Sequence, residues 1–277
     1  MSRSLSLQKL LPHIVSLAYQ AGEAVMKVYA QADMGTTYKD CDSPLTRADT
    51  ESHNIIVEDL RAFTPMVPVL SEESSAVSYE ARRQWQTFWL IDPLDGTKEF
   101  IQRNGEFTVN IALIKEDRPI LGIVHAPAMD VTYFAAQGIG AFKEVARTRT
   151  TQIAAGKYQS ERLKVVVSRS HPSKELETLL NRIGPHECIG MGSSLKICLV
   201  AEGAADFYPR LGPTMEWDTA AAQCVVEAAG GSITDISGRA LKYNKSDMHN
   251  PDFIVTGAAG FQWQSYFHGG EAAVAHD

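Results

Sequence analysis

The sequence has few cysteines and no long hydrophobic run, and both absences narrow the class of protein. Its four cysteines are Cys41, Cys188, Cys198 and Cys224; none forms a Cys-x-x-Cys pair, and no histidine pattern completes a zinc site. We expect four reduced, mostly buried thiols. No stretch approaches the roughly 20 apolar residues of a membrane span, and the start of the chain has no signal-peptide pattern. These absences predict a cytoplasmic protein without an integral membrane segment.

An excess of positive charge is also missing. The formal net charge of the 277-residue chain is -7, so the surface as a whole should repel nucleic acid, and we expect no nucleic acid partner. An anionic small molecule can still bind where cations or local Lys and Arg side chains reverse the field. The hydrophobic fraction of 44% allows a sizeable buried core.

Apolar periodicity predicts helices and strands in mixed order, which favours a layered α/β fold. Helices are expected at 6–31, with Pro12 near the start, and at 46–63, 172–183, 192–201 and 217–229, the last one buried on all sides. Strands are expected at 67–70, 87–91, 107–114, 120–125, 131–135, 163–168, 232–236 and 252–256. The polar segment 147–156 marks a boundary between halves at 1–150 and 151–277, within one compact unit.

The segment Asp92-Pro93-Leu94-Asp95-Gly96-Thr97 carries the densest chemistry. It follows an apolar strand and holds two carboxylates three residues apart around a proline, which stiffens the loop. Asp95 is a suitable N-cap for a short helix starting near Thr97, and the N–H groups of Gly96 and Thr97 would then face an anion. One loop can thus offer carboxylates to metal ions and N–H groups to a phosphate. A plain strand–turn–helix corner capped by aspartates is the alternative.

Three further acidic segments have similar double interpretations. Glu72-Glu73 follows a strand end, where hard oxygen ligands suit magnesium, but a solvated acidic turn has the same pattern. Asp218 opens the apolar helix and is a natural N-cap there. Thr46 and Asp49 resemble a capping box at the start of the second helix. Each segment alone is explained by local structure.

Taken together, these segments resemble a known signature. The segments are, in chain order, Asp49, Glu72-Glu73, Asp92 to Thr97, and Trp217-Asp218-Thr219-Ala220-Ala221. They are similar to the motifs of the lithium-sensitive phosphatases. This superfamily includes inositol monophosphatases, fructose-1,6-bisphosphatases and bisphosphate nucleotidases. The resemblance covers most of the chain. It implies a layered α-β-α-β-α fold, with a mixed or antiparallel sheet in the first half and a smaller α/β second half, and a catalytic cluster of two or three Mg²⁺ ions.

The resemblance also implies a role for each carboxylate. Glu72, Asp92 and the Leu94 carbonyl would hold one metal, and Asp92, Asp95 and Asp218 a second, so that most ligands lie in the first half of the chain. Asp49 and Thr97 match the pair that activates the attacking water, and Glu73 would lie behind the ligands or hold a third metal. Two metals can lower the pKa of a water and clamp the entering and leaving oxygens. Without cations, so many carboxylates in one pocket repel one another.

The substrate is suggested by shorter segments. Four of them resemble segments of the CysQ-type 3'(2'),5'-bisphosphate nucleotidases: Lys98-Glu99-Phe100-Ile101, Ser168-Arg169-Ser170-His171, Gly192-Ser193-Ser194-Leu195-Lys196 and Tyr208-Pro209-Arg210. This implies hydrolysis of adenosine 3',5'-bisphosphate to AMP and phosphate, and of 3'-phosphoadenosine 5'-phosphosulfate to adenosine 5'-phosphosulfate. The candidate substrate-binding residues are Gly96, Thr97, Lys98, Ser168, Arg169, His171, Lys196, Tyr208, Arg210 and Asp218. Each basic residue has the alternative of a surface or helix-end charge; His171 can instead cap a helix, and Tyr208 can belong to the core.

Two other functions stay open. An inositol or sugar monophosphatase would use the same chemistry, although the Lys98-Glu99 continuation argues against it. A catalytically inactive nucleotide-binding regulatory protein is the remote alternative, and the presence of every signature carboxylate argues against that. We expect a monomer rather than a homodimer. The resemblance to CysQ-type enzymes allows peripheral attachment to the inner membrane, but no amphipathic basic helix in this sequence requires it.

Overall fold

The computed structural model describes residues 6–38, 44–74, 77–157, 162–169, 174–258 and 261–267. The helices are α1 (Leu7–Tyr29), α2 (Arg47–Phe63), α3 (Tyr79–Arg82), α4 (Thr97–Ile101), α5 (Lys174–Ile183), α6 (Leu195–Ala201), α7 (Glu216–Ala228) and α8 (Gln264–Phe267). The strands are β1 (Thr37–Tyr38), β2 (Pro44–Leu45), β3 (Val69–Ser71), β4 (Thr87–Asp95), β5 (Thr108–Lys115), β6 (Arg118–Ala126), β7 (Val131–Ala136), β8 (Gly140–Val145), β9 (Arg149–Ile153), β10 (Leu163–Ser168), β11 (His186–Met191), β12 (Phe207–Arg210), β13 (Ser232–Asp235) and β14 (Phe253–Thr256).

Two sheets contain most of the strands. The larger sheet has seven strands in the order β3-β4-β5-β6-β7-β8-β9. Its first pair, β3 and β4, is parallel, and every later pair is antiparallel. The smaller sheet has five strands in the order β11-β10-β12-β14-β13 and is mixed. The expected meander after the Asp92 loop is therefore confirmed.

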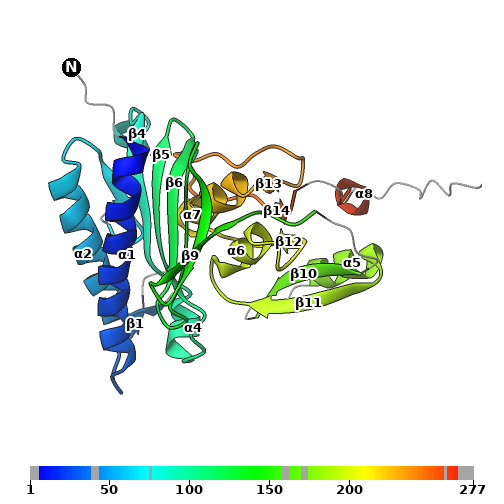
Figure 1. Cartoon of the computed structure of the whole chain (residues 1–277), viewed down its shortest axis with the longest axis horizontal. Helices are drawn as coiled ribbons and strands as arrows, with labels where there is room; N and C mark the ends of the chain where they lie inside the picture. Colours follow the sequence, from blue (N-terminus) through cyan, green and yellow to red (C-terminus); the bar gives the residue numbers. More distant parts are fainter. Residues whose placement is uncertain are drawn as a thin grey trace, which may run out of the picture.

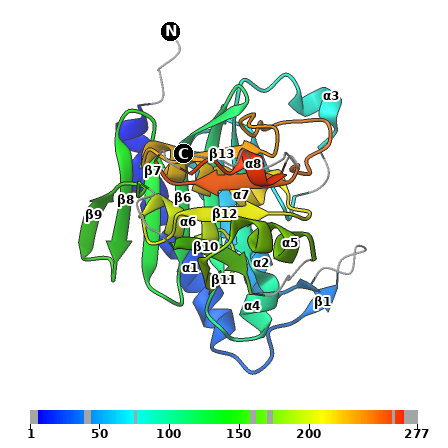
Figure 2. The same ribbon diagram turned by 90° about the vertical axis from the view of Figure 1, so that its right-hand side faces the viewer.

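The elements stack in five layers (Figure 1). Helices α1 and α2 cover one face of the seven-stranded sheet, and α6 and α7 lie between the two sheets. Figure 2 shows α5 and α8 in front of the five-stranded sheet, on its outer face. The α-β-α-β-α fold expected from the sequence is confirmed. None of the helices in the described part of the chain has the length and apolar character needed to cross a membrane.

Strand β4 supplies side chains to two cores because both faces of its sheet are covered. Trp89 and Ile91 pack with α1 and α2 on the outer side, whereas Phe88 and Leu90 face the layer of α6 and α7. A strand buried on both faces is a continuous apolar run rather than an alternating one. This explains why residues 88–91 are uniformly hydrophobic.

Helix α7 approaches the sheet closely at Gly122 of β6. A Cβ atom built on Gly122 would overlap the carbonyl oxygen of Ala221 and lie 2.8 Å from the Cβ atom of Cys224. Small residues on both elements thus let the helix lie directly on the strand, and the middle of α7, residues 219–226, is buried throughout. The first turn of α7 carries Asp218, so this packing also determines where that carboxylate lies.

Besides the two-residue strands β1 and β2, four strands were not predicted from the sequence. Strands β8 and β9 form a hairpin at the edge of the larger sheet, with a turn at Ala146 and Arg147, whose φ angles are both +53°. All but the last side chain of β9 are exposed, so its polar sequence resembles a loop, and residues 149–153 of the polar segment 147–156 form a strand. Strand β11 is another half-exposed edge strand, and β12 has only four residues. The division of the chain at residue 150 stays a prediction.

Candidate active site

The parallel pairing of β3 and β4 brings three acidic residues to one edge of the sheet. Glu72 follows the last residue of β3, and Asp92 and Asp95 lie at the end of β4. The register of β4 against β5 shifts between these two aspartates. The carboxylate oxygens of Asp92 and Asp95 lie within 4.8 Å of each other and of an oxygen of Asp218, which comes from α7. Residues far apart in the sequence thus form one acidic cluster.

Two of the expected helix caps are wrong in detail. The N-cap of α4 is Gly96, with a φ angle of +88°, rather than Asp95. A left-handed φ favours glycine, and Asp95 instead ends β4 and accepts a hydrogen bond from the Ser194 N–H at 2.7 Å. Asp218 lies at the third position of α7, and its Oδ2 accepts from the N–H of the N-cap residue Met215 at 2.8 Å. Both side chains keep an oxygen for other ligands.

The capping box predicted at the start of α2 is confirmed. The backbone N–H and the hydroxyl of Thr46 both donate to Asp49 Oδ2, each at 2.7 Å. The Oγ1 of Thr97 lies 3.4 Å from the other oxygen, Asp49 Oδ1, and 3.3 Å from the carbonyl oxygen of Leu94. The hydroxyl of Ser52 in α2 donates to the Pro93 carbonyl at 2.8 Å and ties the helix to the Asp92 loop.

Burial and mutual repulsion make the cluster electrostatically unfavourable without a cation. Burial raises the pKa of Asp49 and of Asp95 to about 6. Burial first, and then the charges of neighbouring carboxylates, hold the pKa values of Asp92 and Asp218 well above their ordinary range. The charges of Lys196 on Asp95 and of Arg210 on Asp218 offset only part of this effect. Converging carboxylate oxygens are the hard donors that divalent ions such as Mg²⁺ take. The residues present therefore fit a metal centre.

The cluster opens into a cavity of about 300 Å³ between the two sheets. Most of the predicted residues line it, namely Glu72, Asp95, Gly96, Thr97, Lys98, Ser168, Lys196, Tyr208, Arg210 and Asp218. Glu73 raises the pKa of Asp49 through its charge. His171 lies outside the described residues.

Two cationic side chains form a second part of the same cavity. Lys196 is only 8% exposed, and burial lowers its pKa to about 8 although Asp95 opposes the shift. Its ammonium lies 5.9 Å from the centre of the Tyr208 ring. Arg210 donates to the carbonyl of Pro213 at 3.0 Å, and its buried Nε has no partner among the described residues. Buried donors of this kind are suited to an anion.

Arg169 is placed differently from the prediction. It is not among the residues that line the cavity. Its Nε and Nη2 donate to the two oxygens of Glu106 at 2.9 and 2.7 Å, and Nη2 also donates to the Gly190 carbonyl at 2.9 Å. This two-pronged ion pair joins the loop before β5 to the smaller sheet. Glu106 has no distinctive motif, so the sequence offered no signal for the partner.

Sequence reasoning also missed the contribution of Ser194. Its N–H holds Asp95, and its hydroxyl donates to Asn110 Oδ1 at 2.8 Å and contacts Thr108 Oγ1 at 2.9 Å. The motif around it was noted as a resemblance, but the predicted helix was too long: α6 begins only at Leu195. Ser194 thus connects the cluster to β5, and a pair of serines before a helix was the available signal.

Comparison with known proteins agrees with this geometry. The model of the inositol monophosphatase family matches residues 6–266. The chain belongs to this family. Family members similar to it include the 3'(2'),5'-bisphosphate nucleotidase CysQ of Salmonella typhimurium, 47% identical over 249 residues that cover 89% of this chain and 99% of the relative. CysQ of Haemophilus influenzae is 37% identical over 94% of this chain and 97% of its own length.

A solved structure from the same family has the same fold. The crystal structure of CysQ from Bacteroides thetaiotaomicron, described as a bacterial member of the inositol monophosphatase family, superimposes with a TM-score of 0.82 at 40% sequence identity. The match covers 93% of this chain and 100% of that structure. The family expected from the four acidic motifs is therefore confirmed.

Proposed function

We propose that this protein is a magnesium-dependent 3'(2'),5'-bisphosphate nucleotidase that converts adenosine 3',5'-bisphosphate to AMP and phosphate. The observation that carries the proposal is the composition of one cavity, in which a buried carboxylate cluster and the cations Lys196 and Arg210 both contribute to the lining. In a substrate with two phosphates, one phosphate can bind the metal ions of the carboxylate cluster and the other can bind the two cations. The CysQ relatives carry the same activity in their names, and 3'-phosphoadenosine 5'-phosphosulfate is a second expected substrate.

The acidic cluster would hold two Mg²⁺ ions, and Glu73 would contribute to a third. Glu72, Asp92 and the Leu94 carbonyl would be ligands of one ion, and Asp92, Asp95 and Asp218 ligands of the other. Bound Mg²⁺ supplies positive charge that polarises the phosphoryl oxygens and acidifies a nearby water. Backbone N–H groups hold two of these ligands in place: Ser194 donates to Asp95, and Met215 donates to Asp218.

Asp49 and Thr97 accept the proton of the attacking water. Because both Thr46 donors occupy Oδ2 of Asp49, only Oδ1 is available on the side of Thr97. The water donates to Thr97 Oγ1, and the Thr97 hydroxyl donates to Asp49 Oδ1. A carboxylate whose pKa is raised to about 6 by burial is a stronger base than an ordinary aspartate and is still largely ionised at neutral pH.

Lys196 and Arg210 hold the phosphate that is not removed. Both line the cavity, together with Ser168 and Tyr208. An inositol monophosphate has no second phosphate and would leave the buried Lys196 ammonium and the buried Nε of Arg210 without an anion, which costs binding energy. The cations therefore favour a bisphosphate over a monophosphate.

The test is phosphate release from adenosine 3',5'-bisphosphate, measured with and without Mg²⁺. Inositol 1-phosphate serves as the substrate control, and Asp92→Asn as the variant that lacks one of the proposed metal ligands. We expect release that requires Mg²⁺, is much slower on the inositol ester and falls to background in the variant. Fast turnover of the inositol ester alone would retain the metal centre but refute the nucleotide assignment. Nucleotide binding without turnover of either ester would favour the regulatory protein.

The monomeric state and cytoplasmic location stay predictions of the same proposal. Light scattering after size-exclusion chromatography measures the first directly. A mass near the 30.4 kDa of one chain is expected, and a mass twice as large would contradict it.

A further inference from the structure

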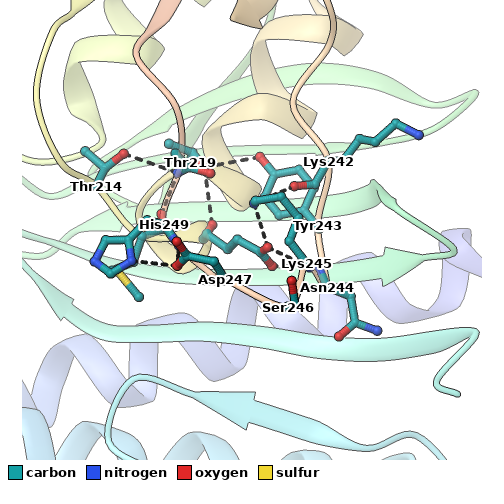
Figure 3. A network of polar contacts seen from close by, with 12 residues as sticks. Thr214, Thr219, Lys242, Tyr243, Asn244, Lys245, Ser246, Asp247 and His249 are labelled. Atoms are coloured by element: carbon teal, nitrogen blue, oxygen red, sulfur yellow. Dashed lines mark hydrogen bonds and ion pairs between the residues drawn. The ribbon is translucent and has the colours of Figure 1, made fainter. Parts of the chain in front are cut away.

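The first turn of α7 is held by a loop, residues 242–250, that lies against it (Figure 3). Glu216, two residues before Asp218, has a side chain with 0% exposure. Its Oε2 accepts from the Asn244 N–H at 2.6 Å, and its Oε1 accepts from the Lys245 N–H at 3.0 Å and from Lys245 Nζ at 2.6 Å. Complete burial of a carboxylate costs free energy, and these three donors offset that cost.

The same loop holds the residues on either side of Glu216. The Glu216 N–H donates to the Met248 carbonyl at 3.0 Å. The Asn250 side-chain amide donates to the carbonyl of Met215 at 2.7 Å, and the Met215 N–H donates to Asp218 Oδ2 at 2.8 Å. Met215 therefore links the loop to the carboxylate of Asp218.

The loop is itself anchored from outside the site. Asn244 has a φ angle of +67°, in the left-handed region that asparagine tolerates better than most residues. Its side chain exchanges two hydrogen bonds with Arg82, which donates to Asn244 Oδ1 at 2.9 Å and accepts from Nδ2 at 2.8 Å. Arg82 is buried and also donates to the Ser246 carbonyl at 3.0 Å. Glu216 thus bonds to a loop held on its other side.

We propose that Glu216 is a positioning residue for the metal ligand Asp218. By holding the loop against residues 215–216, it fixes the Met215 N–H that orients the Asp218 carboxylate. The inference rests on the proposed metal centre. It predicts that Glu216 contributes to metal affinity although it does not line the active-site cavity.

The arrangement requires a carboxylate rather than an amide. Backbone N–H groups approach both oxygens of Glu216, one from Asn244 and one from Lys245. A glutamine offers only one acceptor oxygen, so its NH₂ group would face a backbone N–H donor. The buried donor would lose its partner and the loop would shift. The Glu216→Gln change keeps the size of the side chain and so isolates this effect.

The experiment measures Mn²⁺ affinity by electron paramagnetic resonance, which requires no turnover. We expect Glu216→Gln to raise the Mn²⁺ dissociation constant about 10- to 100-fold, the usual effect of removing a residue that orients a metal ligand. Asp247→Asn is the matched control, because it also removes one negative charge, from the 242–250 loop that Glu216 contacts, at a side chain that is 77% exposed. It should change the affinity less than about threefold.

A second variant separates positioning from through-space charge. Glu216→Gln leaves the Lys245 ammonium without its anionic partner, and a cation near the site would weaken metal binding by itself. The double variant Glu216→Gln/Lys245→Met restores the net charge but not the acceptor. Positioning predicts that the double variant stays at least about tenfold weaker than the wild type. Recovery of wild-type affinity in the double variant would overturn the proposal.

Thermal unfolding in EDTA shows whether each variant is folded. If Glu216→Gln does not fold, Glu216→Asp is used, since it keeps the charge but is too short to reach both donors, and the same loss is expected. Wild-type affinity in a folded Glu216→Gln or Glu216→Asp protein would refute the positioning role. Absence of Mn²⁺ binding in the wild type, or unchanged binding in Asp218→Asn, would instead refute the metal centre on which the inference rests.

Discussion

Asp49 shows how one buried residue divides its two oxygens between structure and chemistry. It is 2% exposed, and Oδ2 is saturated by the two donors of Thr46 at the start of α2. A capping box needs only one carboxylate oxygen. The other oxygen remains available beside Thr97. The capping explanation and the catalytic explanation of this residue are therefore compatible.

Removing the charge of Asp49 should abolish proton acceptance without preventing substrate binding. We expect Asp49→Asn to lower kcat about 10²- to 10⁴-fold, the usual contribution of a general base, with little change in KM because the proposed phosphate contacts remain. Steady-state kinetics on adenosine 3',5'-bisphosphate measures both. Asp59→Asn, on the same helix and paired with His13 far from the cavity, should retain full activity. A large increase in KM for Asp49→Asn would contradict the assigned role.

Lys196 should discriminate between substrates with one and two phosphates. A hydrogen bond to a charged group contributes about 1.5–3 kcal/mol, so Lys196→Met should raise KM for adenosine 3',5'-bisphosphate about 10- to 100-fold. For adenosine 3'-monophosphate, which has no second phosphate, the same variant should change KM only slightly. Lys164→Met, at an exposed position of β10, controls for the loss of a lysine. Equal losses on both nucleotides would place Lys196 at the reacting phosphate instead.

At the scale of elements, α7 connects packing to the metal centre. Its middle packs on β6, its first turn carries Asp218, and the 242–250 loop holds that turn. Gly122 permits this close approach because it has no side chain. A methyl group at this position would overlap the Ala221 carbonyl and the side chain of Cys224.

We therefore expect Gly122→Ala to push α7 away from the sheet. Overpacking of a core typically costs about 1–3 kcal/mol, and urea unfolding should show a loss of this size together with weaker Mn²⁺ binding. Gly190→Ala is the matched control, because the nearest atom to its added Cβ is 3.7 Å away. It should change stability by less than about 0.5 kcal/mol. Weaker Mn²⁺ binding in Gly190→Ala as well would disconnect metal binding from the position of α7.

At the scale of the whole molecule, the acidic cluster opposes folding unless cations are bound. A carboxylate whose pKa is raised in the folded state binds protons more tightly there than in the unfolded chain. For Asp49 and Asp95, the folded state is favoured below the ordinary aspartate pKa of 3.8, and this advantage is lost as the pH rises through the folded-state pKa of about 6. The protein without metal should thus lose stability from this source between these values.

Mg²⁺ should consequently stabilise the protein far more at about pH 7.5 than at about pH 4.5. A concentration 100 times the dissociation constant adds about 2.7 kcal/mol, which corresponds to about 5–10 °C in Tm for a chain of this size. His125, whose pKa burial lowers to about 4, has the opposite pH dependence. The contribution of His125 to stability is the same with and without Mg²⁺, so it cancels when the two Tm values at one pH are subtracted. An equal Mg²⁺ shift at both pH values would contradict the proposed metal cluster.

The sequence by itself determined the features that depend on near neighbours. The α1 and α2 helices, the capping box of Thr46 and Asp49, and the acidic motifs at strand and helix ends could all be predicted, because periodicity and capping act within one turn or one strand. The family followed from the order of those motifs. Exposed edge strands such as β9 were missed because their polar side chains do not alternate.

Only the tertiary structure decided which groups meet. Asp218 joins Asp92 and Asp95 because α7 lies on β6 at Gly122. Arg169 binds Glu106, 63 positions away, instead of lining the cavity. A charged side chain can pair with any group of opposite charge that the fold brings near, and partial burial of the pair strengthens the interaction. Spacing along the chain carries no information about such partners, since they come from elements brought together by long-range packing.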